Sequence, residues 1–426
     1  MKILIKNTTV ITVDNANNLL VNTDIGIENG KIVYIGENND FQPDKIIDGE
    51  DKIAMPGLIN AHTHIPMSLL RNYANDLPLF QWLSEKIWPI EGKFNEEHIY
   101  WGSMLSIAEM IKTGTTTFND MYFFMEDMAK AVCETGIRAS LARGMMGESG
   151  DGDVRFDELR SLYKNYNNAG NGRITVMAGP HAPYTCSDEY LKSVMDIADE
   201  MDLPIHIHLS ESKGEVDDSF SSKGISPIEH MDNIGLFNRK TIAAHCVHLS
   251  EDDIDILKKR NVSVAYNPGS NLKLGNGFAP ICSMLEKGVN VALGTDGASS
   301  NNNQNMFEEM NLASIVNKSV TGDTTKVPAI KAIEMATING ARALGIEDKV
   351  GSIEVGKCAD IILVDMDKPH LYPHLDPIAS IVYSAQGSDV SDVLVNGNVV
   401  MENYKLTTIN FKEVKDNIKR LTSTLY

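Results

Sequence analysis

Strands and helices alternate along the middle of the chain, and this alternation is the feature that most limits its fold. Residues 174–178 predict a strand, which a helix follows over residues 189–201 and a second strand over residues 204–209. Ser187 is placed to cap that helix. Further apolar runs follow at residues 241–244, 262–266 and 289–294. Repeated strand–helix units of this kind indicate a parallel sheet with helices packed against it.

The length of this alternating block selects between two parallel architectures. Residues 56–349 have the length of a TIM-like (β/α)8 barrel, which is the fold that we expect. A doubly wound open sheet is the alternative. It usually carries a nucleotide site, but the sequence has neither a G-x-G-x-x-G motif nor a P-loop.

The two ends of the chain predict a second, smaller unit. The N-terminal segment and residues 359–365 and 392–400 have the texture of short strands. Two β segments that flank one long block are expected to meet in space. We therefore predict a small β-sandwich module built from residues 1–55 together with residues 350–426, beside a catalytic barrel of residues 56–349.

Composition limits the partners of this protein. With 42% hydrophobic and 23% charged residues, the chain of 426 residues belongs with ordinary globular enzymes. Asp and Glu number 58 against 38 Lys and Arg, which gives a formal net charge of -20. Such a surface repels phosphate backbones and anionic lipid, so neither nucleic acid nor a membrane is expected as a partner. A small-molecule substrate is expected instead, and a homo-oligomer is left open.

The cysteines and the N-terminal segment bear on location. The five cysteines are far apart and form no C-x-x-C pair, so they predict neither a disulfide framework nor a thiolate zinc site. The first residues alternate polar and apolar side chains and lack the apolar core of a signal peptide. No run approaches the roughly 18 apolar residues of a membrane-spanning helix. A cytoplasmic protein is expected.

Histidine and aspartate side chains follow several of the apolar runs. His62 and His64 follow residues 53–59, which read as one buried strand, and alternate side chains of a strand share a face. Four further residues also stand at or just past the end of a predicted strand: His181, His208, His245 and Asp296. In a β/α barrel these ends meet at one mouth, and neutral imidazoles suit zinc, iron or nickel. His206 is expected to point away from His208 and to pack against a helix.

Four motifs and one C-terminal segment occur in a fixed order along the chain. They are Pro-Gly-Leu-Ile-Asn-Ala-His-Thr-His at residues 56–64, His-Leu-Ser-Glu at 208–211, Ala-His-Cys-Val-His at 244–248, Gly-Thr-Asp-Gly at 294–297 and Gly-Ser-Ile-Glu-Val-Gly-Lys-Cys-Ala-Asp at 351–360. With these motifs the chain resembles the amidohydrolase superfamily, and more closely its 5-methylthioadenosine/S-adenosylhomocysteine deaminases. The resemblance covers nearly the whole length.

The resemblance implies one divalent metal, expected to be zinc, with Fe²⁺, Mn²⁺ or Ni²⁺ as alternatives. Its ligands are expected to be His62, His64, His208 and Asp296, with a water at the open position. No carboxylated lysine between two metals is indicated. Zinc in such a site lowers the pKa of its bound water to about 7, which generates hydroxide near neutral pH.

The resemblance also implies roles at the reacting carbon. Glu211 is expected to give a proton to the purine ring nitrogen as hydroxide attacks, which requires a raised pKa or a neighbour that restrains it. The alternative for Glu211 is a surface carboxylate at the start of a helix. Asp296 is expected to accept the proton of the water and relay it to the departing ammonia. His245 is expected to hydrogen-bond the hydroxide.

Five further residues are expected to contact a nucleoside. By the resemblance, Glu91 binds two ribose hydroxyls, Trp88 packs on the nucleoside and His181 contacts the purine. Arg143 and Arg155 face the amino-acid tail of S-adenosylhomocysteine, because the planar guanidinium binds both oxygens of a carboxylate. Without the resemblance, Trp88 reads as loop core and Glu91 as a solvated charge. Arg155 reads almost equally well as a mobile surface charge.

These expectations combine into one predicted activity and two alternatives. The first is a metal-dependent hydrolase of carbon–nitrogen bonds in cyclic amidines. It would convert the adenine ring of S-adenosylhomocysteine, 5'-methylthioadenosine or adenosine to hypoxanthine, with release of ammonia. The second is a related hydrolase that acts on guanine, cytosine or a chlorinated triazine. The third is a non-catalytic barrel that serves in assembly or binding. The smaller cytidine-type deaminases are disfavoured, because their H-x-E and P-C-x-x-C signature is absent from the sequence.

Overall fold

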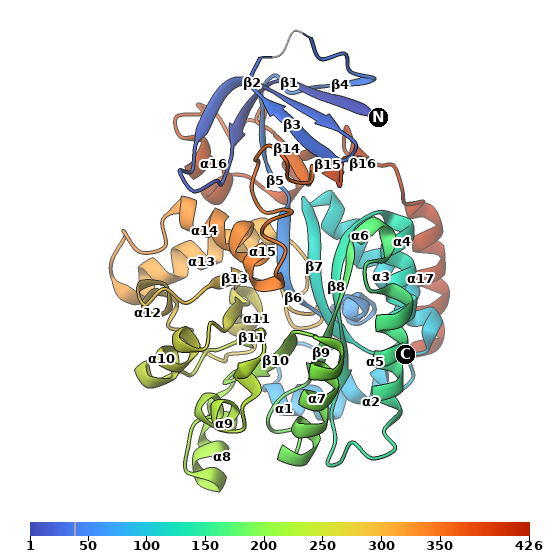
Figure 1. Cartoon of the computed structure of the whole chain (residues 1–426), viewed down its shortest axis with the longest axis vertical. Helices are drawn as coiled ribbons and strands as arrows, with labels where there is room; N and C mark the ends of the chain where they lie inside the picture. The colour runs from blue at the N-terminus through green and yellow to red at the C-terminus, as the bar shows by residue number, and fades with distance from the viewer. Residues whose placement is uncertain (38–39) are drawn as a thin grey trace.

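The computed structural model describes residues 1–37 and 40–426, and these residues form two separate β-sheets (Figure 1). One sheet has eight strands in the order β13-β12-β11-β10-β9-β8-β7-β6. The other has nine and is mixed, with the order β17-β16-β15-β14-β5-β1-β2-β3 and with β4 paired to β1. In Figure 1 the mixed sheet lies at the top of the molecule, and the loop helices α1 and α2 lie at the opposite end of the barrel.

The eight-stranded sheet is a barrel of parallel strands. They are β6 (Leu58–Thr63), β7 (Thr115–Tyr122), β8 (Arg138–Met145), β9 (Ile174–Pro180), β10 (Ile205–Leu209), β11 (Thr241–His245), β12 (Ser263–Tyr266) and β13 (Val291–Leu293). Both faces of these strands are buried, which explains why they read as continuous apolar runs. The predicted TIM-like barrel is confirmed, and the open sheet is excluded.

The first and last barrel strands meet through hydrogen bonds at their carboxyl ends. The backbone N–H of Asp296 donates to the carbonyl of His62 at 3.0 Å. The Asn60 side chain bridges the same seam, because its amide donates to the Thr295 hydroxyl at 2.7 Å and its Oδ1 accepts from the Thr295 backbone N–H at 3.0 Å. The seam therefore brings the motif of residues 56–64 beside the motif of residues 294–297.

Helices surround the barrel and follow its strands in the sequence. They are α3 (Glu96–Lys112), α4 (Met125–Thr135), α5 (Val154–Tyr166), α6 (Ala169–Gly172), α7 (Asp188–Met201), α8 (Lys213–Lys223), α9 (Pro227–Asn233), α10 (Glu251–Lys259), α11 (Pro268–Lys273), α12 (Ile281–Glu286), α13 (Met306–Thr321), α14 (Ala329–Met335) and α15 (Ile338–Leu344). Two further helices, α16 (Pro377–Tyr383) and α17 (Phe411–Leu425), follow strands of the mixed sheet. The hydroxyl of Ser187 accepts the Tyr190 N–H at 3.0 Å, which confirms the predicted cap of α7. Within the described ranges, every helix is too short or too polar to span a bilayer.

The mixed sheet joins the two ends of the chain, as predicted. Its strands are β1 (Lys2–Ile11), β2 (Leu19–Glu28), β3 (Lys31–Ile35), β4 (Lys45–Asp48), β5 (Lys52–Pro56), β14 (Ile361–Asp365), β15 (Val390–Val395), β16 (Asn398–Glu402) and β17 (Lys405–Leu406). Antiparallel pairing of β5 with β14 connects the N-terminal strands to the C-terminal strands. A buried ion pair of Arg138 with Asp360, at 3.0 Å for each of two N–H groups, fastens this sheet to barrel strand β8. We propose residues 1–55 and 350–426 as the extent of this module.

One predicted strand is in fact two strands in different sheets. Residues 53–59 were expected to form a single buried strand, but β5 ends at Pro56 and β6 begins at Leu58. Gly57 lies between them, and its N–H donates to the Asp360 carbonyl at 2.9 Å. A Cβ at this position would lie 2.1 Å from the Thr116 hydroxyl oxygen, so the close passage from module to barrel requires glycine.

Candidate metal centre and active site

Three histidines and one aspartate from separate motifs converge at the carboxyl ends of the barrel strands. His62 lies in β6 and His64 directly follows that strand, His208 lies in β10, and Asp296 follows β13. The Nε2 atoms of His64 and His208 are 3.2 Å apart. Asp296 Oδ1 lies 3.5 Å from His62 Nε2 and 3.4 Å from His64 Nε2. The structure thus brings together the four residues that the sequence proposed as metal ligands.

The hydrogen bonds of the imidazole rings show that this cluster fits a cation. Nδ1 of His64 donates to the Met121 carbonyl, and Nδ1 of His208 donates to the His181 carbonyl, both at 2.7 Å. A carbonyl only accepts, so each neutral ring keeps its lone pair on Nε2. Two lone pairs that face each other at 3.2 Å repel unless a cation lies between them.

The remaining histidine of the cluster supports the same conclusion. Nε2 of His62 is buried and has no hydrogen-bond partner among the described residues. Burial is the main cause that lowers the pKa of His62 to about 3, so the ring is neutral and able to bind a metal. Imidazole nitrogens and a carboxylate oxygen are a common ligand set for a catalytic divalent metal.

A second trio of ligand atoms overlaps the first. His62, His64 and Asp296 form one group whose ligand atoms lie within 4.8 Å of one another, and His62, His208 and His245 form another. His245 is anchored differently from the other rings, because its Nδ1 lies 2.9 Å from Asn271 Oδ1 and its Nε2 lies 3.8 Å from Glu211. The geometry therefore places His245 between the metal cluster and a carboxyl group.

Asp296 is held as an ionised carboxylate. Its Oδ2 accepts hydrogen bonds from the hydroxyls of Ser270 at 2.6 Å and Ser300 at 2.8 Å, and its Oδ1 accepts from the Gly297 N–H at 2.7 Å. Burial alone would raise the pKa of Asp296. The imidazoles of His62 and His64, whose Nε2 atoms lie 3.5 Å and 3.4 Å from Oδ1, instead hold the pKa of Asp296 well below its usual value.

Glu211 is a buried carboxyl group at the edge of the cluster. It is 6% exposed, and its Oε1 accepts a hydrogen bond from the Asn276 amide at 2.9 Å. Burial raises the pKa of Glu211 against the opposing charge of His245. The alternative of a surface carboxylate is therefore wrong, and Glu211 has the environment of a group that holds a proton.

The chain leaves several of these strands through left-handed backbone conformations. Ser210 has φ 50°, His245 has φ 73°, Cys246 has φ 50° and Asp296 has φ 62°. Non-glycine residues seldom adopt such angles, and clusters of them are typical of functional sites. These turns direct Glu211, His245 and Asp296 into the barrel mouth.

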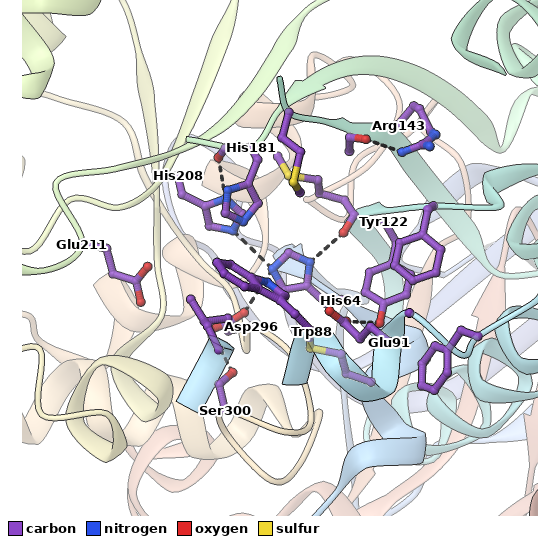
Figure 2. Close-up of a pocket in the computed structure, with 18 of the residues that line it drawn as sticks. His64, Trp88, Glu91, Tyr122, Arg143, His181, His208, Glu211, Asp296 and Ser300 are labelled. Carbon is purple, nitrogen blue, oxygen red and sulfur yellow. Dashed lines mark hydrogen bonds and ion pairs between the residues drawn. The ribbon is translucent and has the colours of Figure 1, made fainter. Parts of the chain in front are cut away.

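A cavity of about 590 Å³ extends from the metal cluster. The expected substrate residues line it together with the cluster: Trp88, Glu91, Arg143, Arg155, His181, Glu211 and Asp296. Figure 2 shows Glu211 and Asp296 on one side of His64, and Tyr122 and Arg143 on the other. The cavity thus has a polar end beside the metal cluster and a second end beside the arginines.

The loop after β6 supplies part of the cavity wall, including Trp88 and Glu91. It contains η1 (Ile65–Leu70), α1 (Leu79–Gln81), the π-helical turn η2 (Trp82–Ile87) and α2 (Trp88–Glu91). Trp88 is 40% exposed, so it is not loop core. Glu91 accepts a hydrogen bond from the Tyr122 hydroxyl, and burial raises the pKa of Glu91, so it is not an ordinary solvated charge.

His181 presents an unprotonated ring nitrogen to the cavity. The Thr185 hydroxyl donates to the Ala182 carbonyl at 3.1 Å, so it accepts from Nδ1 of His181 at 2.9 Å. The lone pair of a neutral His181 is then on Nε2. Burial lowers the pKa of His181 to about 4, assisted by the charges of His64 and His245.

Both arginines of the cavity are paired with carboxylates. Arg143 Nε lies 2.6 Å from Glu158, and a terminal N–H donates to the Gly144 carbonyl. Arg155 Nε lies 2.9 Å from Asp153, and a terminal N–H donates to the Met146 carbonyl. These contacts therefore fix the Arg155 guanidinium at the cavity wall.

The expectation for His206 was wrong. Its Nε2 lies 2.8 Å from His62 Nδ1, and its Nδ1 lies 3.2 Å from the Asn119 amide, all inside the barrel. Residues two apart on a strand share a face, so the position of His206 follows from its spacing to His208. The ring supports His62 from below the cluster.

Other supporting residues gave no signal in the sequence. Asp120 is buried and accepts from the Thr63 hydroxyl at 2.8 Å and from the Ile65 N–H at 2.6 Å, so it holds the residues on both sides of His64. Burial raises the pKa of Asp120 to about 7. Ser270 in α11 and Ser300 in the turn after β13 both donate to Asp296, and nothing in the sequence spacing connects either residue to it.

The sequence matches the model of the amidohydrolase family over residues 53–400. It is also 53% identical to a 5-methylthioadenosine/S-adenosylhomocysteine deaminase of Thermoanaerobacter pseudethanolicus, over 100% of this chain and 99% of that relative. The chain belongs to the amidohydrolase family. A deaminase of the same name from Acetivibrio thermocellus is 49% identical over 99% of each chain. The resemblance predicted from the motifs is confirmed.

Solved structures of this amidohydrolase's relatives have the same fold. An adenosine deaminase from Xanthomonas campestris with bound zinc superimposes with a TM-score of 0.96 at 35% identity, over 99% of this chain and 98% of that one. An atrazine chlorohydrolase from Arthrobacter aurescens, in complex with zinc, gives 0.92 at 26% identity, over 99% and 100%. Two zinc-containing relatives and the buried histidine cluster support a divalent metal in this amidohydrolase.

Proposed function

We propose that this amidohydrolase deaminates the adenine ring of S-adenosylhomocysteine, 5'-methylthioadenosine or adenosine by hydrolysis, yielding the inosine analogue and ammonia. The observation that carries the proposal is the position of Glu211, a buried carboxyl of raised pKa beside Asp296 and His245 at the end of a nucleoside-sized cavity. The names and high identities of the curated relatives support the same activity.

The residues that would hold the metal are His62, His64, His208 and Asp296, and the proposed metal is zinc, with Fe²⁺, Mn²⁺ or Ni²⁺ as alternatives. When bound, the metal would lower the pKa of a water to about 7 and so supply a nucleophile near neutral pH. Because the Nδ1 atoms of His64 and His208 are anchored to carbonyls, Nε2 is the nitrogen of each ring that would bind the metal.

Three side chains would move or hold protons. Glu211 would protonate the ring nitrogen, because the amino-bearing carbon is a poor electrophile until the ring is protonated. Asp296, ionised and bonded to two serine hydroxyls, would accept the proton of the attacking water and pass it to the leaving amine. His245 would hydrogen-bond the oxygen as negative charge develops on it.

The other end of the cavity would bind the nucleoside and its tail. Glu91 would accept the two ribose hydroxyls, Trp88 would pack on the nucleoside, and the free Nε2 of His181 would meet the purine. Arg143 and Arg155 would bind a tail carboxylate. Because both arginines already pair with carboxylates, a substrate tail would have to compete with Glu158 and Asp153.

A substrate panel tests this proposal. At least one of adenosine, 5'-methylthioadenosine and S-adenosylhomocysteine should lose adenine absorbance and release one ammonia per turnover. The likeness to an atrazine chlorohydrolase makes hydrolysis of a triazine or another heterocycle the second candidate function. An enzyme of that kind would leave adenosine unchanged. A non-catalytic barrel would turn over none of these compounds.

The partners and location stay predictions from composition. We propose a small nucleoside as the partner, with no binding to nucleic acid or membranes, in a cytoplasmic protein that is free to form homo-oligomers. The net charge of -20 supports the exclusion of polyanions.

A further inference from the structure

Helix α8 follows the left-handed turn at Ser210, which we call the Ser210 turn. The one buried residue of this helix is Glu215, which is 4% exposed. The other side chains of this helix are exposed or partly exposed. A helix normally packs through an apolar stripe, and burial of a carboxyl costs free energy unless hydrogen bonds compensate for the lost water. The buried carboxyl of Glu215 is therefore expected to accept hydrogen bonds that offset this cost.

Those partners are two consecutive backbone N–H groups. Oε1 of Glu215 accepts from the N–H of Ser210, and Oε2 accepts from the N–H of Glu211, both at 2.9 Å. The Ser212 hydroxyl caps the helix by accepting the Glu215 N–H at 3.2 Å. The carboxyl group thus accepts hydrogen bonds from the two peptide groups on either side of the Ser210 α-carbon.

The Ser210 turn is a strained one. Ser210 has φ 50°, in the left-handed region, and its carbonyl accepts the N–H groups of Val247 and His248 at 3.0 Å each. The turn is therefore held at its carbonyl from the β11 side and at its amides by Glu215. This turn sets the direction of the next residue, Glu211. The carboxyl of Glu211 accepts a hydrogen bond from the Asn276 amide and lines the cavity.

We infer that Glu215 is a positioning residue for the proton donor: by binding both amides of the Ser210 turn, it fixes the orientation in which Glu211 meets the substrate ring. This inference rests on the proposed function of Glu211. Burial raises the pKa of Glu215 to about 7, which reflects the cost of keeping this carboxyl in place. Glu215 itself does not line the cavity.

The test compares variants that keep different numbers of acceptors. Glu215→Gln keeps one acceptor oxygen at nearly the same volume, and Glu215→Met keeps none. Asp218→Asn, on the exposed face of the same helix, is the matched control. The measurements are kcat, KM, metal content and Tm of the metal-loaded enzyme. They are joined by the affinities for the product and for a nucleoside analogue that is tetrahedral at the reacting carbon.

A positioning role predicts a graded loss of kcat with KM within about twofold. A misplaced reacting group costs up to about 10²-fold, so we expect about a tenfold loss for Gln and about a hundredfold loss for Met. The tetrahedral analogue should lose affinity in proportion to kcat/KM, whereas product affinity and metal content should not change. Asp218→Asn should behave like the wild type.

Two results would overturn the inference. Wild-type kcat in both variants would show that Glu211 needs no such support. A fall in metal content or Tm that accounts for the whole loss of activity, with equal loss of product and analogue affinity, would show a merely structural role. The wild type serves as the reference for the proposed function. If it deaminates none of the adenine nucleosides, the proposed function fails, and that outcome differs from an active wild type with unaffected variants.

Discussion

The two ends of the cavity are built in different ways. At the metal end, His62 is fully buried, and the rings of His64 and His208 are each anchored through Nδ1 to a backbone carbonyl. At the other end, Trp88 is 40% exposed, and Arg155 pairs with an aspartate near the surface. The proposed metal ligands are thus fixed by the barrel, whereas Trp88 and Arg155, which we propose bind the substrate, lie beyond its strands and can change without disturbing it.

The relatives are consistent with this division. The fold is shared with an adenosine deaminase and with an atrazine chlorohydrolase at TM-scores of 0.96 and 0.92. Those two proteins differ in what their names say they act on, although both bind zinc. A shared barrel with exchangeable loops would account for such a pair.

Removal of the metal should have the largest effect, because the metal end supplies the nucleophile. Dialysis against a chelator should lower kcat by about 10³-fold or more, since the metal contributes several kcal/mol of stabilisation. Added zinc should restore the rate, and added magnesium, which prefers oxygen ligands, should not. Full activity in a sample shown to be metal-free would contradict the role proposed for the metal end in the chemistry.

Glu211→Gln should separate proton transfer from metal binding. The variant should retain its metal and lose activity on the order of 10²-fold or more. In the wild type, Glu211 must be protonated to act, so kcat/KM should fall as pH rises through the raised pKa of this group. That basic limb should vanish in the variant, and an unchanged profile would mean that another group donates the proton.

Arg155→Ala should change substrate preference and leave the chemistry intact. Loss of a charge-assisted hydrogen bond costs about 1.5–3 kcal/mol, so KM for S-adenosylhomocysteine should rise about tenfold or more. Adenosine has no tail carboxylate, and its KM should not change. Arg160→Ala, an exposed arginine of the same helix, is the control. Equal effects on both substrates would place Arg155 outside the tail site.

Glu309 allows a smaller test of the metal end through stability. It accepts the Gly269 N–H at 3.0 Å and the Asn301 amide at 2.7 Å, and burial raises its pKa to about 8 from 4.5. The folded state therefore holds this proton more tightly than the unfolded state. The free energy of unfolding should fall as pH rises from about 5 to about 8.

Glu309→Gln has no such proton to lose, so its Tm should decline less steeply over this range. For the free energy of unfolding, the pH slopes of the wild type and the variant should differ by at most about 1.4 kcal/mol per pH unit. Glu308→Gln, at the exposed neighbouring position, should keep the wild-type slope. Parallel curves for wild type and Glu309→Gln would show that Glu309 does not carry the predicted shift.

The sequence revealed the parts of the molecule that follow a fixed period. Strand ends carry His62, His64, His208 and Asp296, and barrel geometry alone predicts that such ends meet. His206 shares a face with His208 by the same alternation, and its ring therefore lies beneath His62 and not against a helix as expected. The break at Gly57 was also missed, because an apolar run does not tell which of two sheets it belongs to.

Residues that act through bends in the backbone could not be found in this way. Glu215 reaches Ser210 and Glu211 only because Ser210 turns left-handed, and Ser300 reaches Asp296 from a loop. No periodic pattern marks such contacts. A glutamate in a polar helix looks like a solvated charge until its partners are seen.

The most direct test of the account is a crystal structure of the protein with anomalous data collected at the zinc edge. We expect one peak per chain, bonded to Nε2 of His62, His64 and His208 and to a carboxylate oxygen of Asp296, with His245 and Glu211 facing the open position. A peak held by His62, His208 and His245 without Asp296, or no peak in an active crystal, would contradict the proposed centre.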